Sequence, residues 1–312
     1  MERRNQFRKW IVLASLIAVL ASCTASPAAT PTAVSSPPIL LSTSAVTVNV
    51  GETLVSPKDD MTLVAVPAGE FVMGSENGLT DEQPAHNVML DTFWLDQTEI
   101  TNAMYHHCVE AGVCDPPSAT TFYSDAAYAD HPIVFVSWND ARTYCSWVDR
   151  RLPTEAEWEK AASWDPRTNE KLVYPWGNEF DCTKGNFDDE TQIDSFVISG
   201  GPNCDGYMQS APVGSYPPGA SPYGALDMGG NVWEWVHDAF IETDPFNATI
   251  QNYYAVSPPM NPQGVDPTIT DYRVMRGGSW NINFGFGRSA YRLWFGLDDS
   301  YDFVGFRCAS SE

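Results

Sequence analysis

Seven cysteines are the residues with the widest chemical options in this chain of 312 residues. Thiolates can bind zinc or copper, act as nucleophiles, or pair as disulfides. Cys23 stands apart near the N-terminus, and the others show neither a CxxC pair nor a Cys/His cluster with zinc spacing. An even set of six outside the cytoplasm favours three disulfides over a metal–thiolate centre. The six are Cys108, Cys114, Cys145, Cys182, Cys204 and Cys308.

Acidic side chains greatly outnumber basic ones. The chain has 40 Asp and Glu against 17 Lys and Arg, for a net charge of −23. A surface of this sign repels nucleic acid, so no nucleic-acid partner is expected. Loop carboxylates supply the oxygen ligands that Ca²⁺ prefers, but the same excess also serves plain solubility, and charge alone does not decide between them. The five histidines, His237 among them, lack metal-ligating spacing and are interpreted as ordinary surface or core residues.

The first 22 residues have the pattern of an export signal. Four basic residues come first, Arg3, Arg4, Arg8 and Lys9, and an apolar run too short to span a bilayer comfortably follows. The sequence LASC at 20–23 resembles the lipobox of bacterial lipoproteins, in which the cysteine becomes the lipidated first residue. We therefore expect Cys23 to carry a lipid anchor that attaches the protein to a membrane, facing the extracytoplasmic side of the cell envelope. An ordinary signal peptide with an incidental cysteine is the alternative.

The segment 23–52 and the residues after it differ in composition. Residues 23–52 are rich in Ala, Ser, Thr and Pro with almost no charge, so they cannot bury a core and are predicted to form a flexible tether. A single domain over residues 53–312 follows. Strand-like runs at 61–66 and 70–73 flank Pro67-Ala68-Gly69 and predict a hairpin, and further strands are expected at 88–95, 272–276 and 304–309.

Three helices have recognisable starts. Thr101 can cap a helix that ends near Gly112, and Ser137 can cap another whose apolar residues recur at helical spacing. Thr154 with Glu157 makes a capping box for the third. After Ala162 the chain is mostly Gly, Pro, Asn, Asp and aromatic residues, which predicts long irregular loops. Such loops need support beyond backbone ladders, and disulfides and bound cations are the candidates.

Seven segments, in order, resemble the formylglycine-generating enzyme (sulfatase-modifying factor) family. They are VPAGEFVMG (66–74), VSWNDA (136–141), RLPTEAEW (151–158), YPWGN (174–178), YGALDMGGNVWEW (223–235), RGGSW (276–280) and GFRC (305–308). The resemblance spans about 250 residues. It implies an α+β, C-type-lectin-like fold that is rich in loops and has little regular secondary structure. A fold alone does not fix a function, and this family includes members with other roles.

The family's named reaction depends on a pair of cysteines shortly after the RGGS segment. There a copper ion bound by both thiolates activates oxygen to oxidise a substrate cysteine to formylglycine. In this chain residues 280–292 read WNINFGFGRSAYR, with no cysteine, so copper is not expected. The resemblance also implies a Cys145–Cys308 disulfide. Proximity along the chain suggests Cys108–Cys114 and Cys182–Cys204 for the others.

Two calcium sites are implied by the resemblance. The first set consists of the side chains of Asn186 and Asp205 with the carbonyls of Phe187 and Tyr207. The second set consists of the side chains of Asp227 and Glu234 with the carbonyls of Gly230 and Val232. Asp227 stands where the family often has Asn, which keeps the oxygen and adds charge. The alternative is a pair of hydrogen-bonded loops whose acids face water.

Two functions from different classes fit these observations. One is a non-catalytic, calcium-stabilised binding or accessory domain that holds a peptide or glycan near Trp233, Ser279, Asn281 and Arg292. In the family, the positions of Trp233 and Ser279 lie at the active pocket. The other is a formylglycine-generating-type oxidoreductase, or a related enzyme of the family with an altered active site. The missing cysteine pair favours the first.

Overall fold

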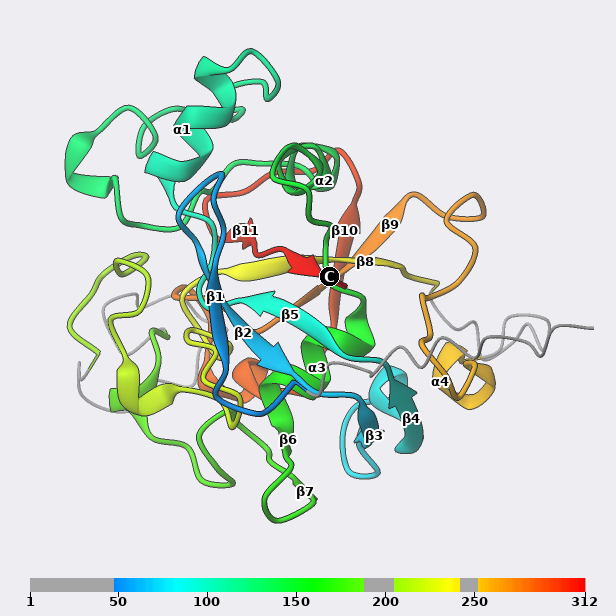
Figure 1. The fold of residues 1–312 in the computed structure, drawn as a ribbon. Helices are drawn as coiled ribbons and strands as arrows, with labels where there is room; N and C mark the ends of the chain where they lie inside the picture. Colours follow the sequence, from blue (N-terminus) through cyan, green and yellow to red (C-terminus); the bar gives the residue numbers. More distant parts are fainter. Residues whose placement is uncertain (1–47, 188–204, 242–251, 312) are drawn as a thin grey trace, which may run out of the picture. The chain divides into compact units, whose positions relative to one another are not determined.

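The structure is a computed structural model that describes residues 48–187, 205–241 and 252–311, all within the unit Val46–Glu312. These residues form two four-stranded sheets, two two-stranded ribbons and four helices (Figure 1). The strands are β1 Thr53–Val55, β2 Thr62–Val66, β3 Gly69–Met73, β4 His86–Leu90, β5 Phe93–Asp96, β6 Trp164–Asp165, β7 Glu170–Lys171, β8 Trp233–Ala239, β9 Tyr272–Arg276, β10 Leu293–Gly296, β11 Val304–Phe306 and β12 Ala309–Ser310. The helices are α1 Asn102–Glu110, α2 Trp138–Trp147, α3 Glu155–Ser163 and α4 Tyr253–Val256.

The predicted hairpin at residues 67–69 is wrong. β2 pairs with β5 and β3 pairs with β4, so residues 62–73 and 86–96 run antiparallel as two bent strands. Pro67 has no N–H to donate to the ladder, and the amide of Ala68 donates instead to Thr92 Oγ1 at 3.0 Å. Both strands bend at this level, which also splits the predicted strand 88–95 into β4 and β5. The bend transfers the chain from the two-stranded ribbon into the sheet β1-β2-β5-β12.

The second sheet has the order β10-β9-β8-β11, with β8 and β11 parallel and the other pairs antiparallel. The predicted strand 272–276 is confirmed as β9. The predicted strand 304–309 is divided: β11 joins this sheet, and β12 joins the first sheet beside β5. Arg307 and Cys308 lie at the crossing between the two sheets. Both side chains are fully buried.

The helix starts predicted from the sequence are confirmed. Thr101 accepts a hydrogen bond from the amide of Met104, and both α2 and α3 begin with complete capping boxes. The predicted apolar face of α2 is buried, and it lies in the core cluster that also contains Trp233 and Phe306. A second core cluster surrounds Trp158 of α3. The α+β, loop-rich character expected from the sequence is therefore present, because short elements alternate with long connections.

Buried basic side chains hold the irregular loops. Arg276 donates to the carbonyls of Ser289, Ala290 and Tyr291. Arg307 donates to the carbonyls of three residues, Asp96, Gln97 and Leu226. Lys160 donates to the carbonyls of Pro67 and Gly69. Because buried carbonyls need donors, these side chains support the irregular loops in addition to the disulfides expected from the sequence.

Two of the three predicted disulfides are confirmed. Cys108 pairs with Cys114 after α1, and Cys145 of α2 pairs with Cys308. The third predicted pair, Cys182–Cys204, includes a residue that lies outside the described ranges. None of the helices in residues 48–187, 205–241 and 252–311 has the length and apolar character needed to cross a membrane.

Candidate functional site

The structure brings the first predicted calcium set together. The carboxylate of Asp205 accepts from the amide of Phe187 at 3.1 Å and from that of Tyr207 at 3.0 Å. Asn186 is 1 % exposed, and its side-chain nitrogen donates to the carbonyl of Gln209 at 2.8 Å. Its Oδ1 is buried and has no hydrogen-bond donor among the described residues. The buried Asn186 oxygen is the one side-chain donor of this set that lacks a partner among these residues and could bind Ca²⁺, whereas each oxygen of Asp205 already accepts a backbone amide.

Close backbone packing fixes Asn186 in place. Gly230 has a φ of +90°, and a Cβ at this position would lie 2.4 Å from the carbonyl oxygen of Asn186. The next residue, Asn231, donates its amide to that same carbonyl at 2.8 Å. A glycine at position 230 is therefore required both by its left-handed conformation and by the close approach of Asn186.

The second predicted calcium set does not fit a metal ion as arranged. Both carboxylate oxygens of Glu234 are taken: Arg307 binds them at 2.7 Å each, and Trp158 Nε1 donates to Oε2 at 2.8 Å. Asp227 Oδ2 accepts from the amide of Gly214 at 2.6 Å. A buried guanidinium therefore already neutralises Glu234, and its role as a calcium ligand stays a prediction that this arrangement does not favour. Sequence reasoning missed this partner, although Arg307 lies in the GFRC segment.

Glu99 is a further buried carboxyl beside this cluster that the sequence did not indicate. It is fully buried, and Asn231 Nδ2 donates to its Oε1 at 2.9 Å. Burial, and then the neighbouring Asp227 carboxyl, raise the pKa of Glu99 well above its ordinary value. Burial likewise raises the pKa of Asp227. Burial therefore disfavours the charged form of both carboxyls.

The four predicted pocket residues occupy different environments. Trp233 is 1 % exposed and packs in the core, with its ring 5.9 Å from that of Tyr291. Ser279 is fully buried and donates to Asn281 Oδ1 at 2.7 Å. Arg292 is 4 % exposed and forms a two-bond ion pair with Glu155 at 2.6 and 2.8 Å. Only Asn281 is partly exposed, so the four side chains do not together face an open site.

A cavity of about 460 Å³ lies beside the segment between Ser279 and Arg292, although none of the four predicted pocket residues lines it. Arg288 and Ala290 contribute to its lining, opposite the residues after β3 and the stretch Lys171–Val173. Both cations of this cavity are neutralised. Lys171 pairs with Glu159 at 2.5 Å, and Arg288 pairs with Glu82 at 2.7 Å. The cavity is thus concave, partly apolar and electrostatically balanced.

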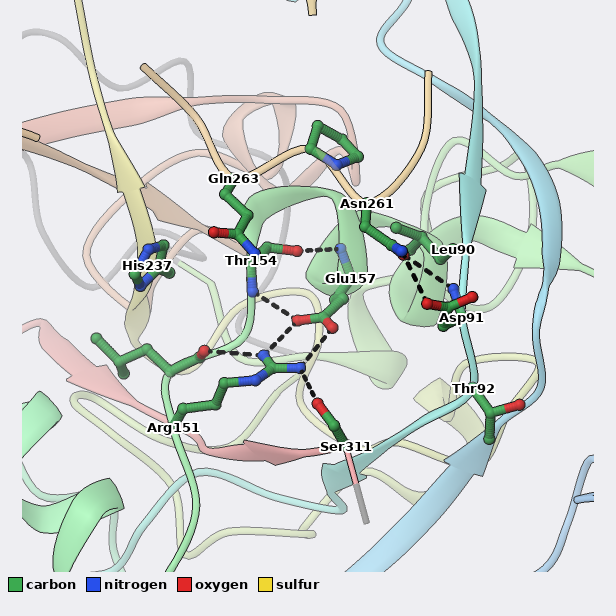
Figure 2. A pocket seen from close by; sticks show the side chains of 12 residues that line it. Leu90, Asp91, Thr92, Arg151, Thr154, Glu157, His237, Asn261, Gln263 and Ser311 are labelled. Carbon is green, nitrogen blue, oxygen red and sulfur yellow. Dashed lines mark hydrogen bonds and ion pairs between the residues drawn. The ribbon is translucent and has the colours of Figure 1, made fainter. Parts of the chain in front are cut away.

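A second cavity, of about 420 Å³, lies between the end of β4, the first turn of α3, β8 and the loop at Asn261–Gln263 (Figure 2). Arg151 crosses its floor and binds both oxygens of Glu157 at 2.6 and 2.7 Å. His237 lies on one side, and the hydrogen-bonded pair of Asp91 and Asn261 lies on the other. Burial, and then the charge of Arg151, lower the pKa of His237, so its ring is neutral at pH 7. Sequence analysis had interpreted His237 as an ordinary histidine.

The metal-binding options within the described ranges are narrow. Four of the cysteines form two disulfides, and the described part of residues 280–292 contributes no thiol. No group of three or more His, Cys, Asp or Glu side chains suited to a metal ion occurs in this part of the chain. The first predicted calcium set is not a group of this kind, because two of its predicted ligands are backbone carbonyls and one is a side-chain amide.

Known relatives are similar in sequence to this chain over most of its length. It is similar to the hercynine oxygenase of Mycolicibacterium smegmatis, with 31 % identity over 265 residues, 75 % of this chain and 57 % of that protein. The chain thus spans less than two thirds of that relative. It is also similar to the formylglycine-generating enzyme of Streptomyces coelicolor, with 32 % identity over 310 residues, 81 % of this chain and 90 % of that protein.

Solved structures and a family model agree with these relatives. The fold is similar to that of PvdO from Pseudomonas aeruginosa, with a TM-score of 0.66 and 25 % identity over 84 % of this chain and 98 % of that one. The predicted C-type-lectin-like, sulfatase-modifying-factor-like fold is thereby confirmed. Residues 51–312 match the model of the sulfatase-modifying factor enzyme 1-like domain, and the chain therefore belongs to the formylglycine-generating enzyme (sulfatase-modifying factor) family.

Proposed function

We propose that this chain is a non-catalytic binding or accessory domain of the family, displayed on the cell envelope through a lipid on Cys23. The observation that carries this proposal is the absence of cysteine from residues 280–292, where the family chemistry needs two thiolates. Disulfide pairing of four other cysteines supports it, since it leaves those sulfurs unavailable to copper. The cavity beside Arg288 and Ala290 is the candidate site for a peptide or glycan, because these two residues lie between Ser279 and Arg292, two of the predicted pocket residues.

A family enzyme with altered chemistry is the second candidate. The names of the two relatives favour it: one is a hercynine oxygenase and the other a formylglycine-generating enzyme. An oxygen-dependent reaction in this chain would need a redox centre that uses ligands other than the cysteine pair. A direct assay of substrate oxidation separates the two candidates.

The purified chain is expected to leave a sulfatase-motif cysteine peptide unchanged in the presence of copper and oxygen. The physical reason is that the amides of Asn281 and Asn283 replace thiolates and do not stabilise Cu(I). Mass spectrometry of the peptide reads out the conversion. The enzyme from Streptomyces coelicolor, run in parallel, shows that the assay works. Conversion by this chain at a comparable rate would reject the non-catalytic role.

Calcium is proposed to bind at Asn186 and Asp205 and to stabilise the domain. At a concentration roughly 100 times the Kd, the ion should add about 2.7 kcal/mol to the free energy of unfolding. Thermal melts in calcium and in chelator measure the difference. Asp205→Asn should abolish the calcium-dependent shift, whereas Asp227→Asn should keep it, because the second set is held by Arg307. An equal shift in both variants would place the ion elsewhere, and no shift in the native chain would argue against a calcium site.

The anchor is proposed from the LASC sequence and the uncharged segment 23–52. Cys23→Ala in the full chain is expected to move the protein from the membrane fraction to the soluble fraction, because lipidation requires the thiol. Fractionation followed by immunoblotting, together with mass spectrometry of the mature N-terminus, tests this. A native protein that is already soluble and unacylated would contradict the proposal.

A further inference from the structure

The cavity in Figure 2 shares no lining residue with the cavity at Arg288, and it combines part of the segment RLPTEAEW with four other stretches of the chain. Five separated segments of the chain build its walls. The β4 edge is occupied by the loop that follows α4: Met89 donates to the carbonyl of Pro259 at 2.7 Å, and Asn261 donates to the carbonyl of Met89 at 2.9 Å. An extended peptide therefore cannot add to this edge as a further strand.

Hydrogen bonds between side chains fix the wall in place. Asn261 Oδ1 accepts from the amide of Asp91 at 3.0 Å, and its Nδ2 donates to Asp91 Oδ2 at 2.8 Å. On the floor, Arg151 also donates to Ser311 Oγ at 2.8 Å. Glu157 is held a third time, by the amide of Thr154 at 2.8 Å. These polar groups are pre-organised, so a ligand that meets them loses little free energy in ordering the site.

The charge balance of the cavity selects against a strongly charged ligand. Arg151 and Glu157 neutralise each other, and His237 is neutral at pH 7. Asp91 is the one remaining charge of the lining and makes no ion pair within the described residues. An anion would meet Asp91 and Glu157, and a cation would find a single exposed carboxylate. The lining therefore suits an uncharged polar ligand.

The polar groups of the lining both donate and accept. Neutral imidazole has one donor and one acceptor, and the amide of Gln263 has two donors and an acceptor. Neither side chain has a hydrogen-bond partner among the described residues, and both line the cavity. Hydroxyl groups donate and accept in the same way. Leu90, Leu152 and Pro262 also belong to the lining, but all three are buried and leave the polar groups as the main contacts for a ligand.

We infer that the cavity between His237, Arg151–Glu157 and Asp91–Asn261 is a binding site for a short neutral saccharide. Its volume of about 420 Å³ lies within the roughly 300–1,000 Å³ that is usual for small-molecule sites. Hydroxyls of the sugar donate to Asp91 and exchange hydrogen bonds with His237 and Gln263, whereas the oxygens of Glu157 already accept from Arg151 and Thr154. This site is separate from the one in the proposed function and does not depend on the absence of catalysis.

Saturation-transfer NMR with the mature chain tests the site, with maltose, cellobiose and N,N′-diacetylchitobiose as probes at millimolar concentration and digalacturonate as the acidic comparison. At least one neutral disaccharide should receive saturation, and digalacturonate should bind more weakly. His237→Phe keeps a ring but removes both nitrogens, and Gln263→Ala removes the amide. Each variant should weaken binding at least tenfold. His107→Phe, an exposed histidine on α1, is the matched control and should bind as the native chain does.

Three results would overturn the inference. The first is that none of the neutral probes binds the native chain, which would mean that the cavity holds solvent only. The second is binding that survives both His237→Phe and Gln263→Ala, which would place the sugar elsewhere. The third is tighter binding of digalacturonate than of any neutral probe, which would reject the ligand class. Circular dichroism of each variant confirms that any lost binding is not lost folding.

Discussion

Replacing both Cys145 and Cys308 with alanine is expected to lower the free energy of unfolding by about 5 kcal/mol. The two residues are 163 positions apart, so the disulfide restricts a very long loop in the unfolded chain. Single domains are typically stable by only about 5–15 kcal/mol. The double variant should therefore lie close to the limit of stability. It should also lose the covalent link between α2 and the crossing that joins the two sheets.

The second disulfide supplies the matched control. Cys108 and Cys114 are only 6 positions apart, and the same chain-entropy model gives their removal a cost of about 2 kcal/mol. Urea denaturation of the native chain and of the two double alanine variants measures both losses at constant solvent conditions. Losses of equal size would contradict the loop-length argument and would assign the effect to packing at the buried sulfurs.

Local features of this fold could be predicted from the sequence. A helix start depends on a capping residue and on the residue three positions later. Each helix start could therefore be recognised from its capping residue, which is Thr101, Ser137 or Thr154. Strand pairing depends on residues far along the chain and could not be predicted in this way. The segment Pro67-Ala68-Gly69 has the composition of a turn, but its conformation is set by Thr92 and by partners on β4 and β5.

The site was predictable only where the donors are close in sequence. Asp205 contacts the amide of Phe187, the neighbour of Asn186, and the calcium site that the family resemblance implies there stays a prediction. Glu234 was assigned to a metal by the family resemblance, and no pattern in the sequence indicated its partner Arg307, which lies 73 positions away. The spacing of residues in a sequence does not show which basic side chain will pair with a given buried carboxylate. The place of His237 in a cavity was likewise not visible in the sequence, since the groups around it come from α3, the end of β4 and a distant loop.

Arg307 is the side chain whose loss should reveal how this domain stabilises its loops. All five of its N–H groups are used: two bind Glu234, and three bind the carbonyls of Asp96, Gln97 and Leu226. Although burial by itself lowers the pKa of a guanidinium, the Glu234 carboxylate holds that of Arg307 above its ordinary value. Arg307→Met is expected to cost about 3–5 kcal/mol, because it leaves a buried carboxylate without its counter-charge.

Two controls separate the charge of Arg307 from its geometry. Arg307→Lys keeps the charge but offers three donors instead of five, so it should recover only part of the loss. Arg167→Met removes an arginine whose side chain is 72 % exposed beside Asp165, and no measurable change in the free energy of unfolding is expected.

Urea denaturation of the three variants gives the comparison. If Arg307→Met were no more costly than Arg167→Met, the buried arginines would not be what holds the loops. If Arg307→Lys were fully stable, charge alone would suffice and the carbonyl contacts would contribute little. We expect the order native, Arg307→Lys, Arg307→Met, since a lysine can neutralise Glu234 but cannot reach three carbonyls at once.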